Sequence, residues 1–331
     1  MNTDLELCMT DDACDSDSVL YNVTQAINLL KKISKDWQYR AQVKQGEFDG
    51  EEFFDNSKDD FLIDLLPFKD HPLFTDANDE MKKRILTCGW LAYNEKTIDI
   101  EAEVITPACM HIIHGEFPGL QKIMSTIASQ TLVDEAYHVL LVNTGSQLTR
   151  QRRGLFSLAF PESNLITKMR NFQQQHSEKW QRTLILLVTA IVSELFISDY
   201  LRLLSHERSI QPLNRMIVET HRRDELLHSS IFKNMAKCIY ASLNMEKREF
   251  FMKVLPLPIR WFANLELDVW SSILQQIGFH NSHTLINDCR SINEENIEKI
   301  DYSGLIALAK ELETSNTRIG MDSFYSEGLI A

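Results

Sequence analysis

The chain carries one five-residue pattern, Asp-Glu-x-x-His, twice: once over residues 134–138 and once over residues 224–228. In an α-helix, positions i and i+3 lie on the same face, so the Glu and His of each copy can bind one ion from a single helix. In a chain of this composition, chance supplies about one Glu-x-x-His pair, and far less than one copy that also has the preceding Asp. Two copies therefore predict two helices that face a shared metal site.

The sequence around both copies is suited to long helices. From Asp79 onward, helix-permissive runs are separated by Gly or Pro breaks at 115–119, 154–161 and 208–212. These breaks predict four core helices, with an interruption of the third near Gln175 and a kink at Pro107 in the first. The predicted ranges are 79–113, 119–150, 163–206 and 212–243. Because no hairpin-like alternation or internal repeat appears, the predicted fold class is all-α, with a core bundle at 79–243 and additional flanking helices.

The flanking sequence completes a single predicted domain over residues 19–331. Residues 1–18 are acidic and lack periodicity, which predicts a mobile tail. A helix is expected over 19–38, with Val23, Ala26, Ile27 and Leu30 on one face. Irregular structure with short helices is expected over 45–79, and a helix pair at 258–277 and 304–314 would close the bundle.

Glu194 is a candidate for a third metal-binding carboxylate, because it interrupts the apolar run 184–196. A bare carboxylate buried among such neighbours costs several kcal/mol. A bound cation would remove that cost, and so would an arginine partner such as Arg182 or Arg202.

A fourth carboxylate is expected from the first core helix, since a two-metal site in a bundle takes one Glu from each of two further helices besides the two Glu-x-x-His pairs. Glu101 is the candidate, and Glu103 remains an alternative. Four carboxylates with neutral histidines carry a charge of about −4, which two divalent metals balance. Oxygen and nitrogen donors without a thiolate set favour iron or manganese over structural zinc.

Three more side chains are expected near this site. His221 lies four residues before Glu225 and seven before His228, so its direction on the helix differs from theirs by only about 40° and 20°. Asp134 and Asp224 lie one position away from the ligand direction, where each can accept the outer N–H of a metal-binding histidine.

Composition excludes several other function classes. Lys and Arg total 34 against 47 Asp and Glu, a formal net charge of −13, which repels nucleic acid and anionic membrane surfaces. The 184–196 run is too short to span a membrane and contains a carboxylate. Six cysteines without a CxxC pair, and no signal-like N-terminal segment, predict a reduced cytoplasmic protein.

The order Glu, Glu-x-x-His, Glu, His-x-x-x-Glu-x-x-His resembles that of ferritin-like di-iron N-oxygenases of the p-aminobenzoate N-oxygenase type, over roughly residues 79–235. The third histidine is the specific part, because many ferritin-like oxidases share the doubled pattern alone. The resemblance implies two iron ions, O2 as co-substrate, an external electron donor such as a reductase, and a small-molecule amine oxidised to a hydroxylamine, nitroso or nitro product in secondary metabolism. The metal ligands that the resemblance implies are Glu101, Glu135, His138, Glu194, His221, Glu225 and His228. It implies no further catalytic residue and no cofactor other than the metals. A homodimer is also expected.

Two alternative functions remain open from the sequence. One is a ferritin-like oxidase that acts on carbon as a hydroxylase or desaturase, and the other is iron storage or a non-catalytic metal-binding bundle. The length argues against storage, because a ferritin subunit needs only about half of this chain.

Overall fold

The fold is all-α, as the sequence predicts. The computed structural model describes residues 16–46, 50–115, 117, 119–292, 301–312 and 319–330. Within these ranges the regular structure is helical, and β-pairing is limited to one isolated bridge between Asp59 and Ile210. The predicted tail falls largely on residues 1–15, which lie outside the described ranges, and residues 16–18 already belong to the first helix.

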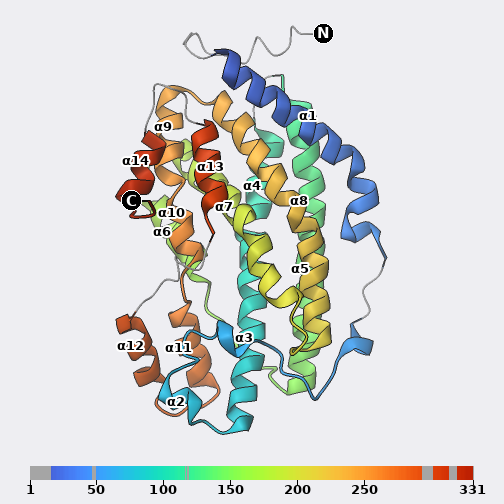
Figure 1. Cartoon of the computed structure of the whole chain (residues 1–331), viewed down its shortest axis with the longest axis vertical. Coiled ribbons are helices and arrows are strands. Elements are labelled where there is room, and N and C mark those ends of the chain that lie inside the picture. Colours follow the sequence, from blue (N-terminus) through green and yellow to red (C-terminus); the bar gives the residue numbers. More distant parts are fainter. Residues whose placement is uncertain are drawn as a thin grey trace.

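Four long helical segments form the core bundle (Figure 1). They are α3 (Asp79–Ile100) with its continuation α4 (Thr106–His114), α5 (Gln121–Arg153), α7 (Lys179–Ser205) and α8 (Pro212–Ser242). The predicted break near Gln175 is confirmed, since α6 (Asn164–Gln174) ends there and α7 begins at Lys179. The core of the fold thus falls within the predicted 79–243 segment.

The expected kink at Pro107 takes the form of a π-helical turn just before it. This turn, η5 (Glu101–Ile105), joins α3 to α4, and the N–H of Thr106 donates to the carbonyl of Glu101, five residues earlier. Proline has no N–H and its ring crowds the preceding turn, so a regular α-helix could not continue unchanged through Pro107. π-turns of this kind are frequent at functional sites.

A glycine in α5 allows close contact with α8. A Cβ built on Gly145 would lie only 2.1 Å from Cδ1 of Ile217, a fully buried side chain of α8. The two helices that carry the Asp-Glu-x-x-His patterns are therefore in direct contact about two helical turns from those patterns.

Shorter helices surround the bundle. The amphipathic helix α1 (Ser16–Arg40) lies obliquely across α5 and α8 (Figure 1), with Val23, Ala26, Ile27 and Leu30 buried. Four short helices follow α1 in the chain: η2 (Gln42–Lys44), η3 (Glu51–Phe53), η4 (Ile63–Leu65) and α2 (Pro72–Thr75). The C-terminal part contains α9 (Met245–Val254), α10 (Leu257–Phe262), α11 (Leu267–Gln276), α12 (Ser282–Ile292), α13 (Ser303–Leu312) and α14 (Ile319–Ser326).

The predicted helix at 258–277 is wrong in one respect, because residues 263–266 divide it into α10 and α11. Glu266 adopts a left-handed conformation with φ 55° and ψ 38°, and its N–H donates to the side chain of Asn264. This local turn replaces the helical hydrogen bonds at that point.

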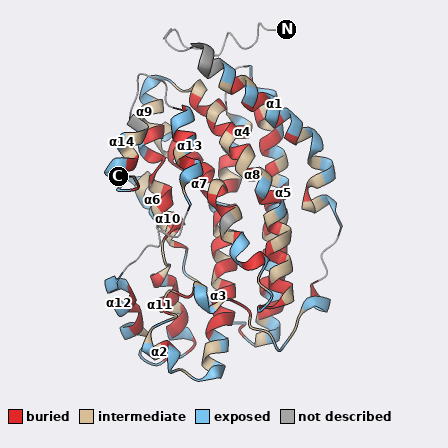
Figure 2. Cartoon of the chain, in the orientation of Figure 1, coloured by how far each residue is buried: buried red, intermediate tan, exposed pale blue. Residues whose placement is uncertain are grey.

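The α7 helix is long and apolar enough to cross a membrane by length and composition alone. However, 82% of its most apolar window is buried inside the protein, as is expected for a core helix. Figure 2 shows the same distribution throughout the bundle, with buried residues where the core helices face one another and exposed residues outside. The apolar neighbours of Glu194 are thus core residues.

Candidate metal centre

All seven of the expected metal-binding side chains meet in the middle of the bundle. They form two groups that share Glu135 and Glu225, and within each group the candidate ligand atoms lie within 4.8 Å of one another. The first group is Glu101, Glu135, His138, His221 and Glu225, and the second is Glu135, Glu194, Glu225 and His228. We call these seven residues the Glu/His cluster.

All four helical segments of the bundle contribute side chains to the cluster. On α8, Nε2 of His221 lies 3.1 Å from Oε1 of Glu225, and Nδ1 of His228 lies 3.3 Å from the same oxygen. The cross-helix approach is equally close, with Nδ1 of His228 2.9 Å from Oε1 of Glu135 on α5. The π-turn brings Oε1 of Glu101 to 3.4 Å from Nε2 of His221.

The structure gives the positions of the two carboxylates for which alternatives were open. Glu103 is outside the cluster, with a side chain that is 47% exposed and paired with Arg170 at 2.7 Å. Of the two arginines considered as partners of Glu194, Arg182 donates to the backbone carbonyls of His176 and Ser177, and Arg202 is exposed. Glu194 is 2% exposed and has His228 as its neighbour, at 3.9 Å.

Asp134 on α5 and Asp224 on α8 each contact the outer nitrogen of a cluster histidine on the other helix. Oδ2 of Asp224 lies 3.2 Å from Nε2 of His138, and Oδ2 of Asp134 lies 3.2 Å from Nε2 of His228. Each Asp therefore orients the histidine of the other helix, which leaves Nδ1 of both rings directed at the shared carboxylates.

The N-terminal segment completes this arrangement, which sequence reasoning did not foresee. Nε1 of Trp37 on α1 donates to both oxygens of Asp134 at 2.9 Å, and the N–H of Gln42 on η2 donates to Asp224 at 3.2 Å. Neither residue belongs to a metal-binding pattern, so the sequence contains no signal that would have identified them. They anchor the two Asp side chains from outside the bundle.

The metal-free cluster shares its protons unevenly. Burial raises the pKa of Glu101 and of Glu194 well above the usual range, and the neighbouring carboxylates add to this effect. Burial also acts on Glu135, but the adjacent histidines outweigh it and lower its pKa to about 2. The pKa of Glu225 is lowered well below its usual range for the same reason.

The histidines divide in a complementary way. Burial opposes their charging, yet the carboxylates beside them raise the pKa of His138 and of His228 well above the usual value. The pKa of His221 is lowered, first by burial and then by the positive charge of His138, whose ring centroid is 4.0 Å away. Without metal, the cluster therefore balances two carboxylates against two imidazolium groups.

The cluster residues fit a pair of metal ions. Oε2 of Glu101, Glu194 and Glu225 are all buried without a hydrogen-bond partner among the described residues, although buried polar atoms in proteins are normally paired. The donors are oxygen and nitrogen only, a set suited to iron and manganese. Two groups with shared carboxylates provide two metal positions, whereas a single ion could not contact all seven donors.

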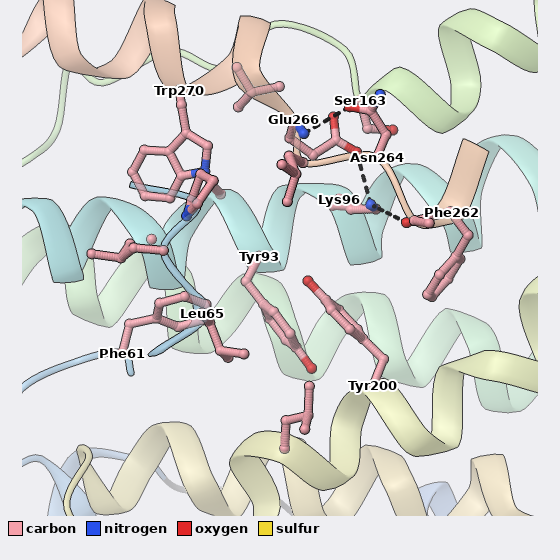
Figure 3. Close-up of a pocket in the computed structure, with 18 of the residues that line it drawn as sticks. Phe61, Leu65, Tyr93, Lys96, Ser163, Tyr200, Phe262, Asn264, Glu266 and Trp270 are labelled. Carbon is pink, nitrogen blue, oxygen red and sulfur yellow. Dashed lines mark hydrogen bonds and ion pairs between the residues drawn. The ribbon is translucent and has the colours of Figure 1, made fainter. Parts of the chain in front are cut away.

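A cavity of about 570 Å³ lies further along α3 and α7 (Figure 3). Its aromatic lining includes Phe61, Tyr93, Phe196, Tyr200, Phe262 and Trp270. None of the cluster residues lines it, but Tyr93 lies two helical turns before Glu101 and Phe196 lies two residues after Glu194. The cavity and the cluster thus lie along the same two parts of the bundle, which are α7 and the segment formed by α3 and η5.

Comparison with known proteins gives one family. The family model described as P-aminobenzoate N-oxygenase AurF matches residues 24–313. The chain is also 30% identical, over 288 residues, to a protein of Streptomyces thioluteus named 4-aminobenzoate N-oxygenase. That match covers 86% of this chain and 85% of the relative.

Proposed function

The chain belongs to the p-aminobenzoate N-oxygenase family, and from this premise we propose that its Glu/His cluster holds two iron ions and that the enzyme oxidises the nitrogen of a primary amine with O2. The enzyme is an N-oxygenase that acts on a small molecule. The observation that carries the metal proposal is the pair of ligand groups that share Glu135 and Glu225.

Glu101, His138 and His221 would hold one ion, Glu194 and His228 the other, and Glu135 with Glu225 would contact both. When bound, two iron ions supply the activation of O2 by reduced metal. The protein's own contribution is to bury and orient the donors. Asp134 and Asp224 fix the two histidine rings, and the apolar walls of α7 keep bulk water away from Glu194.

The protonation pattern supports a charge-matched metal pair. Binding two divalent ions requires all four cluster glutamates as carboxylates and the histidines as neutral rings, so the protons that Glu101, Glu194, His138 and His228 retain must leave. The metal-loaded cluster then has four negative charges against about four positive ones. Iron is proposed over manganese because of the family.

The aromatic cavity is the proposed substrate pocket, since it is a large hollow lined by residues of α3 and α7, and Glu194 lies on α7 while Glu101 lies on the π-turn that continues α3. We further propose a hydroxylamine, nitroso or nitro product in secondary metabolism, an external reductase as electron donor, a cytoplasmic location and a homodimer. Residues 19–331 are proposed to act as one domain.

The cluster geometry alone does not select the substrate atom, so the test must separate oxidation at nitrogen from oxidation at carbon. The deciding experiment loads the protein with Fe(II) under anaerobic conditions, adds O2 and a chemical reductant, and records O2 consumption with and without primary amines. Amine-dependent consumption with an N-oxygenated product by mass spectrometry is expected. Hydroxylation at carbon, or consumption that is independent of amine, would contradict the proposal.

A further inference from the structure

The proposed pocket combines aromatic walls with an unusual balance of charge. Figure 3 shows Tyr93 and Tyr200 side by side, and their rings stack with centroids 4.8 Å apart. The hydroxyl of Tyr93 is buried without a hydrogen-bond partner among the described residues, so it is available to a ligand. Aromatic faces of this kind bind both flat rings and cations.

The buried cation in the described lining is already neutralised. Nζ of Lys96, a residue 8% exposed, lies 2.8 Å from Oε1 of Glu266 and donates to the carbonyl of Phe262 at 3.2 Å (Figure 3). The side chains of Lys96 and Glu266 are 9% and 14% exposed, so water screens this pair only weakly. A ligand carboxylate would have to compete with Glu266 for Lys96.

Glu266 is held firmly in this role. Its Oε2 accepts from the backbone N–H and the side-chain amide of Asn164, at 2.8 and 3.1 Å. Its backbone is left-handed at φ 55°, a conformation that is unfavourable for a non-glycine residue and that clusters at ligand sites. Glu266 thus connects α3, α6 and α11 while it occupies the ammonium group of Lys96.

Asp99 gives the pocket an excess of negative charge. It lines the cavity and accepts from the N–H of Ser163 at 2.9 Å, and no cation is paired with it in the described part of the chain. With Lys96 and Glu266 cancelling, Asp99 remains as a half-buried carboxylate of the lining, whereas Asp70, Arg202 and Asp301, which also line the cavity, are exposed to water that screens their charges. Such a carboxylate attracts a cation and repels an anion.

We propose that this pocket selects amines that carry a positive charge and no carboxylate, with Asp99 as the cation-binding residue and Glu266 as the residue that excludes aminobenzoates. The inference rests on the proposed function of the cavity as the substrate pocket. It sets this chain apart from its Streptomyces relative, whose name specifies 4-aminobenzoate.

Three ligands of equal size test the inference: 4-aminobenzylamine, 4-aminobenzamide and 4-aminobenzoate, which are cationic, neutral and anionic at neutral pH and share one ring amine. Dissociation constants are measured by calorimetry with the iron-loaded enzyme under anaerobic conditions, where no turnover occurs. We expect 4-aminobenzylamine to bind at least about tenfold more tightly than 4-aminobenzoate, with the amide between them. Equal binding, or tighter binding of 4-aminobenzoate, would overturn the inference.

Two variants assign the effect to residues. Asp99→Asn should abolish the preference for the benzylamine. Glu266→Gln leaves Lys96 unpaired and should raise the affinity for 4-aminobenzoate about tenfold or more. If Glu266→Gln does not fold, the inference is still tested by the order of affinities in the wild type and by the loss of that order in Asp99→Asn.

The matched control is the double variant Lys96→Gln with Glu266→Gln, in which the pair has no net charge, as in the wild type. This variant should bind the three ligands in the same order of affinity as the wild type. If the double variant also bound 4-aminobenzoate more tightly than the wild type does, the higher affinity of Glu266→Gln would not be due to the freed charge of Lys96. That result would refute the role of Glu266. O2 consumption with each ligand is recorded separately. Oxygenation of 4-aminobenzoate in preference to the other two ligands would refute this inference and leave the proposed N-oxygenase function intact. The expected order of affinities without any N-oxygenation would count against that function alone.

Discussion

Replacing Glu194 by Gln should stabilise the metal-free protein at neutral pH and prevent it from holding the second metal ion. Glu194 is 2% exposed in the most apolar core helix, and burial raises its pKa well above the ordinary carboxyl value of 4.5. Gln keeps the shape of the side chain but cannot ionise. The variant therefore isolates the cost of the buried carboxylate.

The expected size of the effect follows from proton linkage. Above pH 4.5 the unfolded chain loses the proton of Glu194 while the native wild-type protein retains it. Native-state stability must then fall as pH rises toward the folded-state pKa, by about 1.4 kcal/mol for each pH unit. The Gln variant lacks this dependence on pH. Its free energy of unfolding should therefore equal that of the wild type at low pH and exceed it by about 2.7 kcal/mol two pH units above the ordinary carboxyl pKa.

Urea unfolding of the metal-free proteins, followed by circular dichroism at about pH 5, 6 and 7, measures this difference. Glu103→Gln is the matched control, because Glu103 is a half-exposed carboxylate near Glu101 whose ion pair with Arg170 lies outside the cluster. Loss of that pair should change stability by less than about 1 kcal/mol at every pH. A difference between Glu194→Gln and wild type that does not grow with pH, or full iron content in the variant, would refute the reasoning.

Two further variants test the cluster. Asp134→Ala removes the group that orients His228 and should weaken metal binding about 10- to 100-fold in competition with a chelator, whereas an unchanged affinity would show that the hydrogen bond has no such role. His221→Ala leaves four residues in the first ligand group, as in the second, so it should still bind about two irons but lose at least about tenfold in amine oxygenation. Wild-type turnover in that variant would make His221 a bystander.

Helical periodicity was sufficient to predict five of the seven cluster residues, because the direction of a side chain on a helix depends on spacing alone. Glu135 with His138 and Glu225 with His228 follow from the i, i+3 rule, and His221 follows from its angle to them. Glu194 was identifiable by its apolar neighbours. The choice between Glu101 and Glu103 was not decidable, since the π-turn that directs Glu101 inward depends on how Pro107 is accommodated.

Features that depend on tertiary contacts could not be predicted. Trp37 and Gln42 reach Asp134 and Asp224 across 97 and 182 positions of sequence, and nothing in their local pattern indicates this contact. The pair of Lys96 and Glu266 is equally remote, and the helix break at Glu266 depends on side-chain hydrogen bonds that override local helix preference.

The central claim is that seven side chains bind two iron ions, and anomalous diffraction at the iron edge from crystals of Fe(II)-loaded protein tests it most directly. The account predicts two anomalous peaks, both in contact with Glu135 and Glu225, one next to Glu101, His138 and His221 and the other next to Glu194 and His228. A single peak, or a peak away from these residues in protein that is active, would contradict it.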